Sequence, residues 1–121
     1  DMHATLWDDV SQALDDFYAD LREHDAADNV IVLMFSEFGR RVRDNGSGTD
    51  HGAAGAAFVI GDAVKGGQYG EFPSMKPEDL QQGDLVPNMD FRGLYTTVLE
   101  DWLGLEAKPI VKGNFEAPRF L

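Results

Sequence analysis

Residues 30–35 form an uninterrupted apolar run, Val-Ile-Val-Leu-Met-Phe, which limits the possible folds more than any other feature of the chain. The run shows no alternation between apolar and polar residues. Continuous β-branched and aromatic residues are typical of a strand that is covered on both faces, as in parallel sheets flanked by helices. We therefore expect an α/β fold with a small, mostly parallel sheet, in which residues 30–35 form a central, buried strand.

Two amphipathic segments are predicted to be the flanking helices. Residues 5–24 and 91–103 carry apolar side chains at helical spacing, and the aspartates of the first segment indicate a solvated face. Asp90 is placed to cap the second helix at its N-terminus, and Gly104 to end it in a left-handed conformation. Residues 56–60 are a shorter strand candidate. Residues 39–55 and 62–89 are predicted to be loops, and the tail from residue 108 is predicted to be extended.

Composition excludes several classes of partner. A chain of 121 residues is expected to form a single domain, and its net charge of −12 disfavours nucleic acid and anionic membrane surfaces. No apolar run approaches the roughly 18 residues of a bilayer span, so we expect no membrane insertion. The absence of cysteine removes disulfides and thiolate zinc sites. The chain does not begin with methionine, which suggests a piece of a longer protein. The oligomeric state stays open.

Residues able to bind metal are predicted to meet at one edge of the sheet. Glu37 follows the apolar run, and ligands of open α/β sheets lie beyond the carboxyl ends of strands. A helix that precedes a parallel strand begins at that same edge, which brings Asp1 and His3 close, and the following loop stays there with Asp50 and His51. Imidazoles and carboxylates together suit zinc, manganese or magnesium.

Basic residues are concentrated in the same loop. Arg40, Arg41 and Arg43 are three of only ten basic residues in the chain, and beside a metal they would suit phosphate or sulfate. Salt bridges to Asp44, to Asp50 or to the acidic first helix are the alternative interpretation. Likewise, His3 and His51 could be ordinary polar residues. Ser36 more simply hydrogen-bonds the strand end than acts as a nucleophile.

The order of these motifs resembles a bacterial sulfatase-like family of unknown function in the alkaline phosphatase superfamily. The resemblance runs from residue 1 to about residue 103 and includes Asp-x-His at the start, Ser-Glu-Phe-Gly-Arg at 36–40 and Gly-Thr-Asp-His-Gly at 48–52. It implies the C-terminal part of an alkaline-phosphatase-like fold. It also implies a metal-dependent hydrolase for phosphate or sulfate esters, with zinc or manganese as the expected cofactor, in a bacterial protein whose export to the periplasm is compatible with the family.

The resemblance also assigns residues by motif position. The implied metal ligands are Asp1, His3, Glu37 and His51, and the implied substrate-binding residues are Arg40, Arg41 and Asp50.

This sequence departs from the pattern in three ways. Phe38 stands where relatives have a metal-binding histidine, and the Asp1-x-His3 spacing is tighter than is usual in the relatives. The nucleophile and the first aspartate ligand of such enzymes would lie upstream of Asp1. The catalytic residue is therefore unassigned, the metal site could be empty, and we expect no turnover from the isolated chain. The alternative is a non-catalytic domain that kept the fold and binds an anion or a partner.

Overall fold

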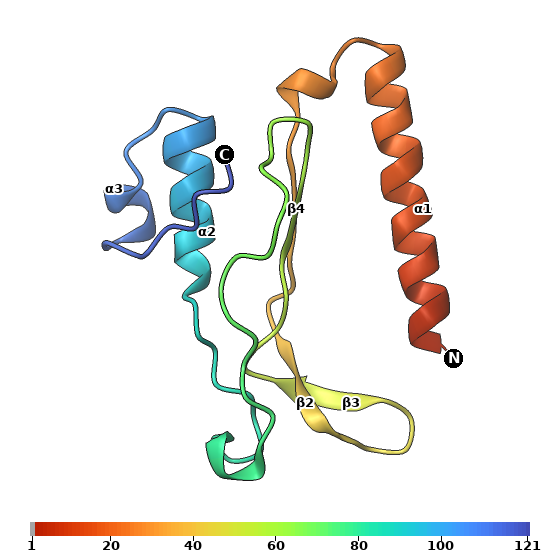
Figure 1. The fold of residues 1–121 in the computed structure, drawn as a ribbon, viewed down its shortest axis with the longest axis vertical. Helices are drawn as coiled ribbons and strands as arrows, with labels where there is room; N and C mark the ends of the chain where they lie inside the picture. Colours follow the sequence, from red (N-terminus) through yellow and green to blue (C-terminus); the bar gives the residue numbers. More distant parts are fainter. Residues whose placement is uncertain (1) are drawn as a thin grey trace.

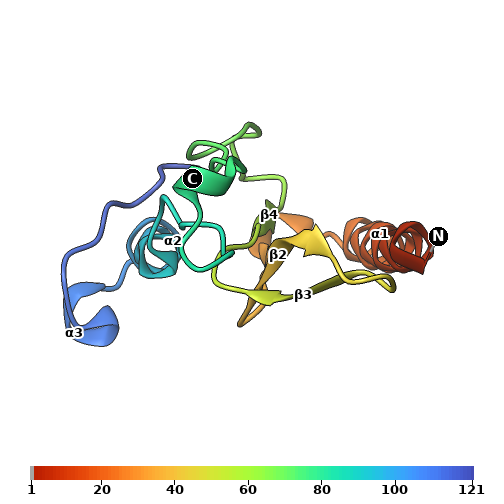
Figure 2. The ribbon, with the colours of Figure 1, turned by 90° about the horizontal axis from the view of Figure 1, so that it is seen from below.

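The computed structural model describes residues 2–121, and the side chains from His3 onward. Its main elements lie in three layers (Figure 1). Helix α1 (Met2–Glu23) stands on one side, a ribbon of β1 (Val32–Met34) and β4 (Phe58–Ile60) lies in the middle, and α2 (Phe91–Thr97) stands on the other side. Figure 2 shows the same order from below. A second pair of strands, β2 (Gly39–Asp44) and β3 (Thr49–Gly52), projects beyond one end of the ribbon.

The sheets are antiparallel, so the predicted parallel α/β fold is wrong. Strand β1 pairs with β4 in the register Val32↔Ile60, and β2 pairs with β3. No parallel pair occurs among residues 2–121, and the fold is a small α+β arrangement of two two-stranded sheets with three α-helices. Parallel neighbours need a crossover connection, usually a helix, whereas β1 and β4 are joined through the β2–β3 hairpin. Hydrophobicity predicted helices on both faces of the strand but could not fix the strand direction.

Strand β1 is half-buried, not central. Val32, Leu33 and Met34 all retain partial exposure, and Phe35, just beyond them, is 57 % exposed. The cause is the width of the ribbon, because in a sheet of two strands each strand is an edge strand.

Helix α1 is attached to the ribbon near both of its ends. The Tyr18 hydroxyl donates to the carbonyl of Ile60 at 2.8 Å and lies 3.2 Å from the carbonyl of Val30. Trp7 meets Phe58 edge to face, with ring centroids 5.8 Å apart. Tyr18 is only 6 % exposed, and burial, helped by the charge of Asp62, raises its pKa. This tyrosine therefore links the helix to β4 and to the segment that leads into β1.

We expect Tyr18→Phe to loosen this attachment. The change removes the single O–H that donates to the Ile60 carbonyl, at a cost of about 1–3 kcal/mol in the free energy of unfolding. Urea denaturation measures that loss. Tyr69→Phe is the matched control, because the Tyr69 hydroxyl donates to Lys65 on the exposed surface. Equal losses for the two variants would contradict the bridging role of Tyr18.

Helix α2 confirms the predicted helix signals and supports the C-terminal tail. The Asp90 side chain accepts from the backbone N–H of Arg92, and the Arg92 side-chain hydrogen bonds lower the pKa of Asp90 to about 2. The helix continues as a π-helical turn, η3 (Val98–Trp102), and Gly104 follows with φ of +64°. The tail is not simply extended, because α3 (Lys108–Val111) interrupts it. Its last residues return to the molecule, where Phe120 is 2 % exposed.

Two short 3₁₀ turns, η1 (Ala27–Asn29) and η2 (Pro77–Asp79), complete the described elements. No helix within residues 2–121 is both long and apolar enough to cross a membrane.

Candidate functional site

The segment predicted to be a loop, residues 39–55, contains the β2–β3 hairpin instead. Its strands pair Arg40 with His51 and Asp44 with Thr49, with an irregularity between these pairs. The turn is stabilised by the Asp44 carboxylate, which accepts from the N–H of Gly46 at 2.6 Å. Gly46 has φ of +95°, a conformation that glycine adopts without strain. The Asn45-Gly46 dipeptide is a turn signal in the sequence that could have predicted this hairpin.

The base of the hairpin requires glycine at position 39. A Cβ on Gly39 would lie 1.7 Å from the carbonyl oxygen of Ala54, and the next residue, Arg40, donates its N–H to that oxygen at 3.1 Å. Gly52, opposite Gly39, is similarly confined, because its Cβ would lie 2.8 Å from the Arg40 carbonyl carbon. Two glycines of the quoted motifs therefore have a packing role in the hairpin.

A stack of three side chains forms on one face of the hairpin. The rings of Phe38 and His51 are nearly parallel, at 10°, with centroids 3.7 Å apart. The guanidinium of Arg40 lies 5.3 Å from the Phe38 ring centroid, within cation–π range, and its Nη1 donates to the Thr49 carbonyl at 2.8 Å. Arg40 and His51 are direct cross-strand partners, so both side chains belong to the same face.

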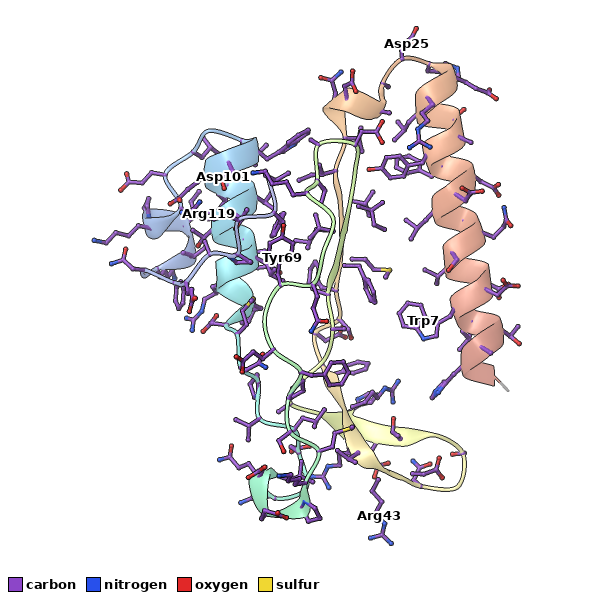
Figure 3. The ribbon with its side chains drawn as sticks, in the orientation of Figure 1. Trp7, Asp25, Arg43, Tyr69, Asp101 and Arg119 are labelled. Carbon is purple, nitrogen blue, oxygen red and sulfur yellow. The ribbon has the colours of Figure 1, made fainter. Side chains whose placement is uncertain are left out.

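The other two hairpin arginines differ in their partners. Arg41 donates through Nε to Asp84 at 3.1 Å, a long-range ion pair that sequence reasoning missed. Arg43 is exposed, points away from the hairpin into solvent (Figure 3), and forms no ion pair with any described residue. Asp50 accepts from the Asn45 side chain at 2.8 Å. The predicted salt bridges to Asp44, Asp50 or the acidic helix are therefore not seen for the arginines of the hairpin: Arg41 is paired with Asp84 instead. Arg40 and Arg43 form no ion pair with a described residue.

The charge of the hairpin segment differs from that of the rest of the chain. Residues 36–52 contain three basic and three acidic residues, whereas the full sequence contains 10 basic and 22 acidic residues. The segment is therefore neutral, and the remainder carries the whole formal charge of −12. An anion meets less repulsion here than elsewhere on the molecule.

The predicted metal ligands are brought together only in part. The His3 imidazole lies 3.6 Å from where a Cβ on Gly48 would stand, so the start of α1 does reach the hairpin that carries His51. Glu37 is exposed and lies 3.4 Å from the Ser36 hydroxyl. Asp1 is outside the described residues. No group of three or more histidines, aspartates or glutamates in residues 2–121 is arranged to hold a metal ion, and the metal assignment stays a prediction.

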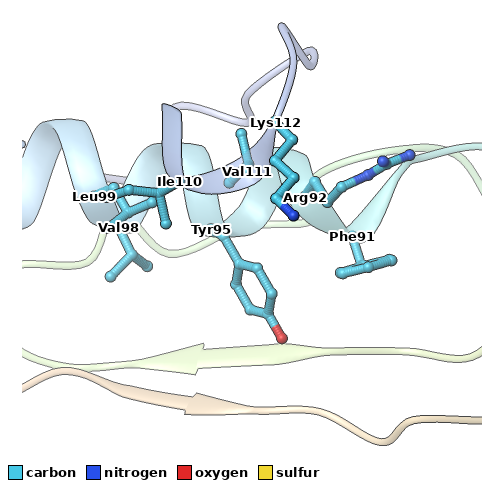
Figure 4. Close-up of a pocket in the computed structure, with 8 residues that line it drawn as sticks. All are labelled: Phe91, Arg92, Tyr95, Val98, Leu99, Ile110, Val111 and Lys112. Atoms are coloured by element: carbon cyan, nitrogen blue, oxygen red, sulfur yellow. The ribbon is translucent and has the colours of Figure 1, made fainter. Parts of the chain in front are cut away.

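A hollow of about 610 Å³ lies elsewhere, between α2 and α3 (Figure 4). It contains none of the predicted site residues, and its wall is mainly apolar. Of its two cationic residues, Arg92 is held by Asp90 at 2.6 Å. The lining residues are Phe91, Arg92, Tyr95, Val98, Leu99, Ile110, Val111 and Lys112. The hollow offers apolar packing surface but no group of acids, bases or nucleophiles.

Comparison with known protein families gives one match. Residues 1–113 match the family described as "Protein of unknown function (DUF1501)", and no sulfatase or alkaline phosphatase family is found. No curated protein and no solved structure matches the chain. The predicted resemblance to a sulfatase-like family of the alkaline phosphatase superfamily is therefore wrong. Its motifs were short, and Gly39 and Gly52 within them are required by the close approach of backbones in the hairpin.

Proposed function

The chain belongs to the DUF1501 family of proteins of unknown function, and since membership brings no activity with it, we propose that the chain binds phosphate or sulfate groups on the β2–β3 hairpin. The observation that carries this proposal is the stack of Arg40, Phe38 and His51. We call this surface the hairpin face and define it by these three residues.

Arg40 is the central residue of the proposal. A guanidinium presents several N–H donors in a plane and binds oxyanions through paired, charge-assisted hydrogen bonds. The ring of Phe38 and the carbonyl of Thr49 already hold Arg40 in place, so binding would cost less side-chain freedom. One Nη1 contact uses part of the donor set, and the remaining N–H groups of this exposed side chain are available to an anion.

His51 and Arg43 support the proposal in different ways. The imidazole lies on the same face as Arg40 and would offer a ring nitrogen to an anion. Arg43, which points into solvent from the same strand, adds positive charge nearby without belonging to the hairpin face. Because the face is exposed, we expect binding to weaken as salt is added.

Arg40→Gln should weaken phosphate binding by about tenfold or more, since a charge-assisted hydrogen bond is lost. Isothermal titration calorimetry at low salt, first with inorganic phosphate and then with sulfate, measures the change in the dissociation constant. Lys108→Gln removes one exposed positive charge far from the hairpin face and should leave binding within about twofold, which separates a local site from general attraction. Arg41→Gln should have an intermediate effect, because that arginine is already paired with Asp84. Equal losses for Arg40→Gln and Lys108→Gln would contradict the site.

Metal-assisted hydrolysis of phosphate or sulfate esters is a second candidate function, favoured by one observation. His3 lies against Gly48, in the same hairpin as His51. In this hypothesis His3, Glu37 and His51, with Asp1, would hold zinc or manganese, which polarises an ester oxygen when bound. The described residues do not form a complete ligand set, so no catalytic step is assigned to them.

A zinc titration tests the second candidate separately. The chain has three histidines, so each imidazole gives a separate NMR signal to follow. We expect the His3 and His51 signals to change together at the same zinc concentration, because two ligands of one ion report the same binding event. His24, which lies beside Asp20 at the far end of α1, is the internal control. Changes at His24 equal to those at His51 would instead indicate weak, non-specific binding.

A further inference from the structure

The turn at the tip of the β2–β3 hairpin contains an asparagine followed directly by a glycine, Asn45-Gly46. The chain has four asparagines, and the other three precede valine, methionine or phenylalanine. Glycine has no side chain to shield its backbone nitrogen, so this nitrogen can approach the side-chain amide of the asparagine before it. Figure 1 shows the turn at the free end of the projecting hairpin, and both residues are exposed to water.

Such a pair is open to deamidation, a reaction that needs only the two residues and water. The backbone nitrogen of Gly46 loses its proton and bonds to the side-chain carbon, Cγ, of Asn45. The bond from Cγ to the side-chain nitrogen breaks, and that nitrogen leaves as ammonia. Water then opens the five-membered imide ring, which leaves an aspartate or an isoaspartate. In sum, one amide and one water become one carboxylate and one ammonium ion, and nothing is oxidised or reduced.

The polar groups that take part in ring closure are hydrogen-bonded in the closed turn. The side-chain nitrogen of Asn45 donates to Asp50 at 2.8 Å, and its side-chain oxygen accepts from the N–H of Ser47 at 3.0 Å. These bonds hold both ends of the amide, whereas ring closure makes its planar carbon tetrahedral and moves both ends. The N–H of Gly46 donates to the Asp44 carboxylate at 2.6 Å. That negative charge opposes loss of the N–H proton, because the nitrogen would itself become negative.

The product of deamidation does not fit the closed turn. An aspartate at position 45 has no N–H to donate to Asp50, so two carboxylates would face each other where a hydrogen bond now lies. An isoaspartate carries the backbone through the side-chain methylene group and lengthens the turn. The longer turn displaces the bond from the N–H of Asn45 to the carbonyl of Gly48, which is now 2.8 Å. Both products therefore favour an open hairpin.

We propose that Asn45 is a deamidation site that the closed hairpin protects and that, once modified, keeps the hairpin open. All the contacts that protect the amide lie within residues 44–50, and the reaction needs no partner or cofactor. Because the amide is released only when the turn opens, the rate of modification follows the population of open hairpin. The proposal does not depend on anion binding at the hairpin face.

Timed incubation of the chain at neutral pH, followed by trypsin digestion and mass spectrometry, tests the protection. The tryptic fragment 44–65 contains Asn45 but no other asparagine and no glutamine, so a gain in its mass assigns the site. We expect Asp50→Ala to speed deamidation by about tenfold, the change that loss of one hydrogen bond to a charged group brings. Asp28→Ala is the matched control and should leave the rate unchanged, because it removes an exposed acid in η1, at the other end of the ribbon (Figure 1). In urea, the unchanged chain should react at least as fast as Asp50→Ala.

Asn45→Asp copies one product and tests its effect on the hairpin. Asn45→Ala is the control, since both variants lose the bond to Asp50 but only the aspartate adds a charge. We expect hydrogen exchange at the Arg40 amide, which bonds to Ala54, to be about two to five times faster in Asn45→Asp, as for one exposed charge pair.

Three outcomes would overturn the proposal. The first is an equal rate of deamidation in the folded chain and in urea, which would mean that the hairpin gives no protection. The second is slower deamidation in Asp44→Ser, because the carboxylate would then promote loss of the Gly46 proton instead of opposing it. The third is equal exchange at Arg40 in Asn45→Asp and Asn45→Ala, which would show that the product does not open the hairpin. If Asp50→Ala proves unfolded by circular dichroism, the comparison with urea still decides the first point.

Discussion

Gly39→Ala should open the base of the β2–β3 hairpin and destabilise the chain by about 3 kcal/mol or more, at the upper end of the cost of forcing extra atoms into a packed site. The added methyl group would lie 1.7 Å from the Ala54 oxygen and 2.0 Å from the Ala54 carbonyl carbon. Both atoms are backbone atoms, so no side-chain rotation relieves the overlap. The strands must separate, and the hydrogen bond from Arg40 to Ala54 is lost with them.

Gly66→Ala is the matched control. A Cβ on Gly66 meets nothing within 4 Å, so the same chemical change should be neutral or slightly stabilising. Any gain would come from the lower conformational entropy of the unfolded chain when alanine replaces glycine. Urea denaturation gives the two free energies, and hydrogen exchange at the Arg40 amide reports the local opening. Similar behaviour of the two variants would show that Gly39 is not in contact with Ala54.

The same variants separate stability from binding. Gly39→Ala removes the scaffold that places Arg40 opposite His51, so it should weaken phosphate binding and lower stability together. Arg40→Gln changes an exposed side chain and should weaken binding while the unfolding midpoint stays nearly constant. A loss of binding in both variants with a loss of stability in only one would assign the anion to the hairpin face.

The helices could be predicted from the sequence because their signals are local. The apolar spacing of α1, the Asp90 cap and the left-handed Gly104 each depend on neighbours within a few positions, and the structure confirms all three. The same kind of signal found strand β1, although this strand covers only Val32–Met34 of the predicted residues 30–35 and is half-buried. Its antiparallel pairing with β4 was not, because hydrophobicity states what covers a strand but not which segment pairs with it or in which direction.

In the candidate site, too, local features could be predicted from the sequence and contacts between distant segments could not. Sequence motifs selected Arg40 and His51, and cross-strand pairing places both on one face. The motifs could not predict the stacking of Phe38 on His51. Phe38 stands where the resemblance implied a metal-binding histidine, so it was interpreted only as a sign of a damaged metal site. The partner of Arg41 was also beyond reach, since Asp84 is 43 residues away and no local pattern joins them. Contacts between distant segments depend on the whole fold, and the predicted fold was of the wrong class.

Gly93→Ala should destabilise the chain even though it places a better helix former in α2. Intrinsic helix propensity favours alanine over glycine by about 1 kcal/mol, which would stabilise an isolated helix. In this chain a Cβ on Gly93 would lie 2.1 Å from the Glu116 carbonyl oxygen, so the C-terminal tail must move away. The hydrogen bond from Thr97 to the Pro118 carbonyl, at 2.6 Å, lies on the same helix side and should be lost.

Two threonine variants give reference values for the loss of stability expected of Gly93→Ala. Thr97→Val removes the bond to Pro118 and the weaker 3.4 Å contact with the Gly93 carbonyl, and it should cost about 1 kcal/mol, because the Pro118 carbonyl keeps the N–H of Phe120 as a donor. Thr96→Val is its control, since the Thr96 hydroxyl bonds only to Arg92 within the helix. Gly93→Ala should exceed both in the loss of stability, and limited proteolysis should release the tail fastest in that variant. If Gly93→Ala stabilised the chain, the helix propensity of alanine would outweigh the overlap with Glu116, and the tail could not lie against α2. Phe120 would then lose its buried position as well.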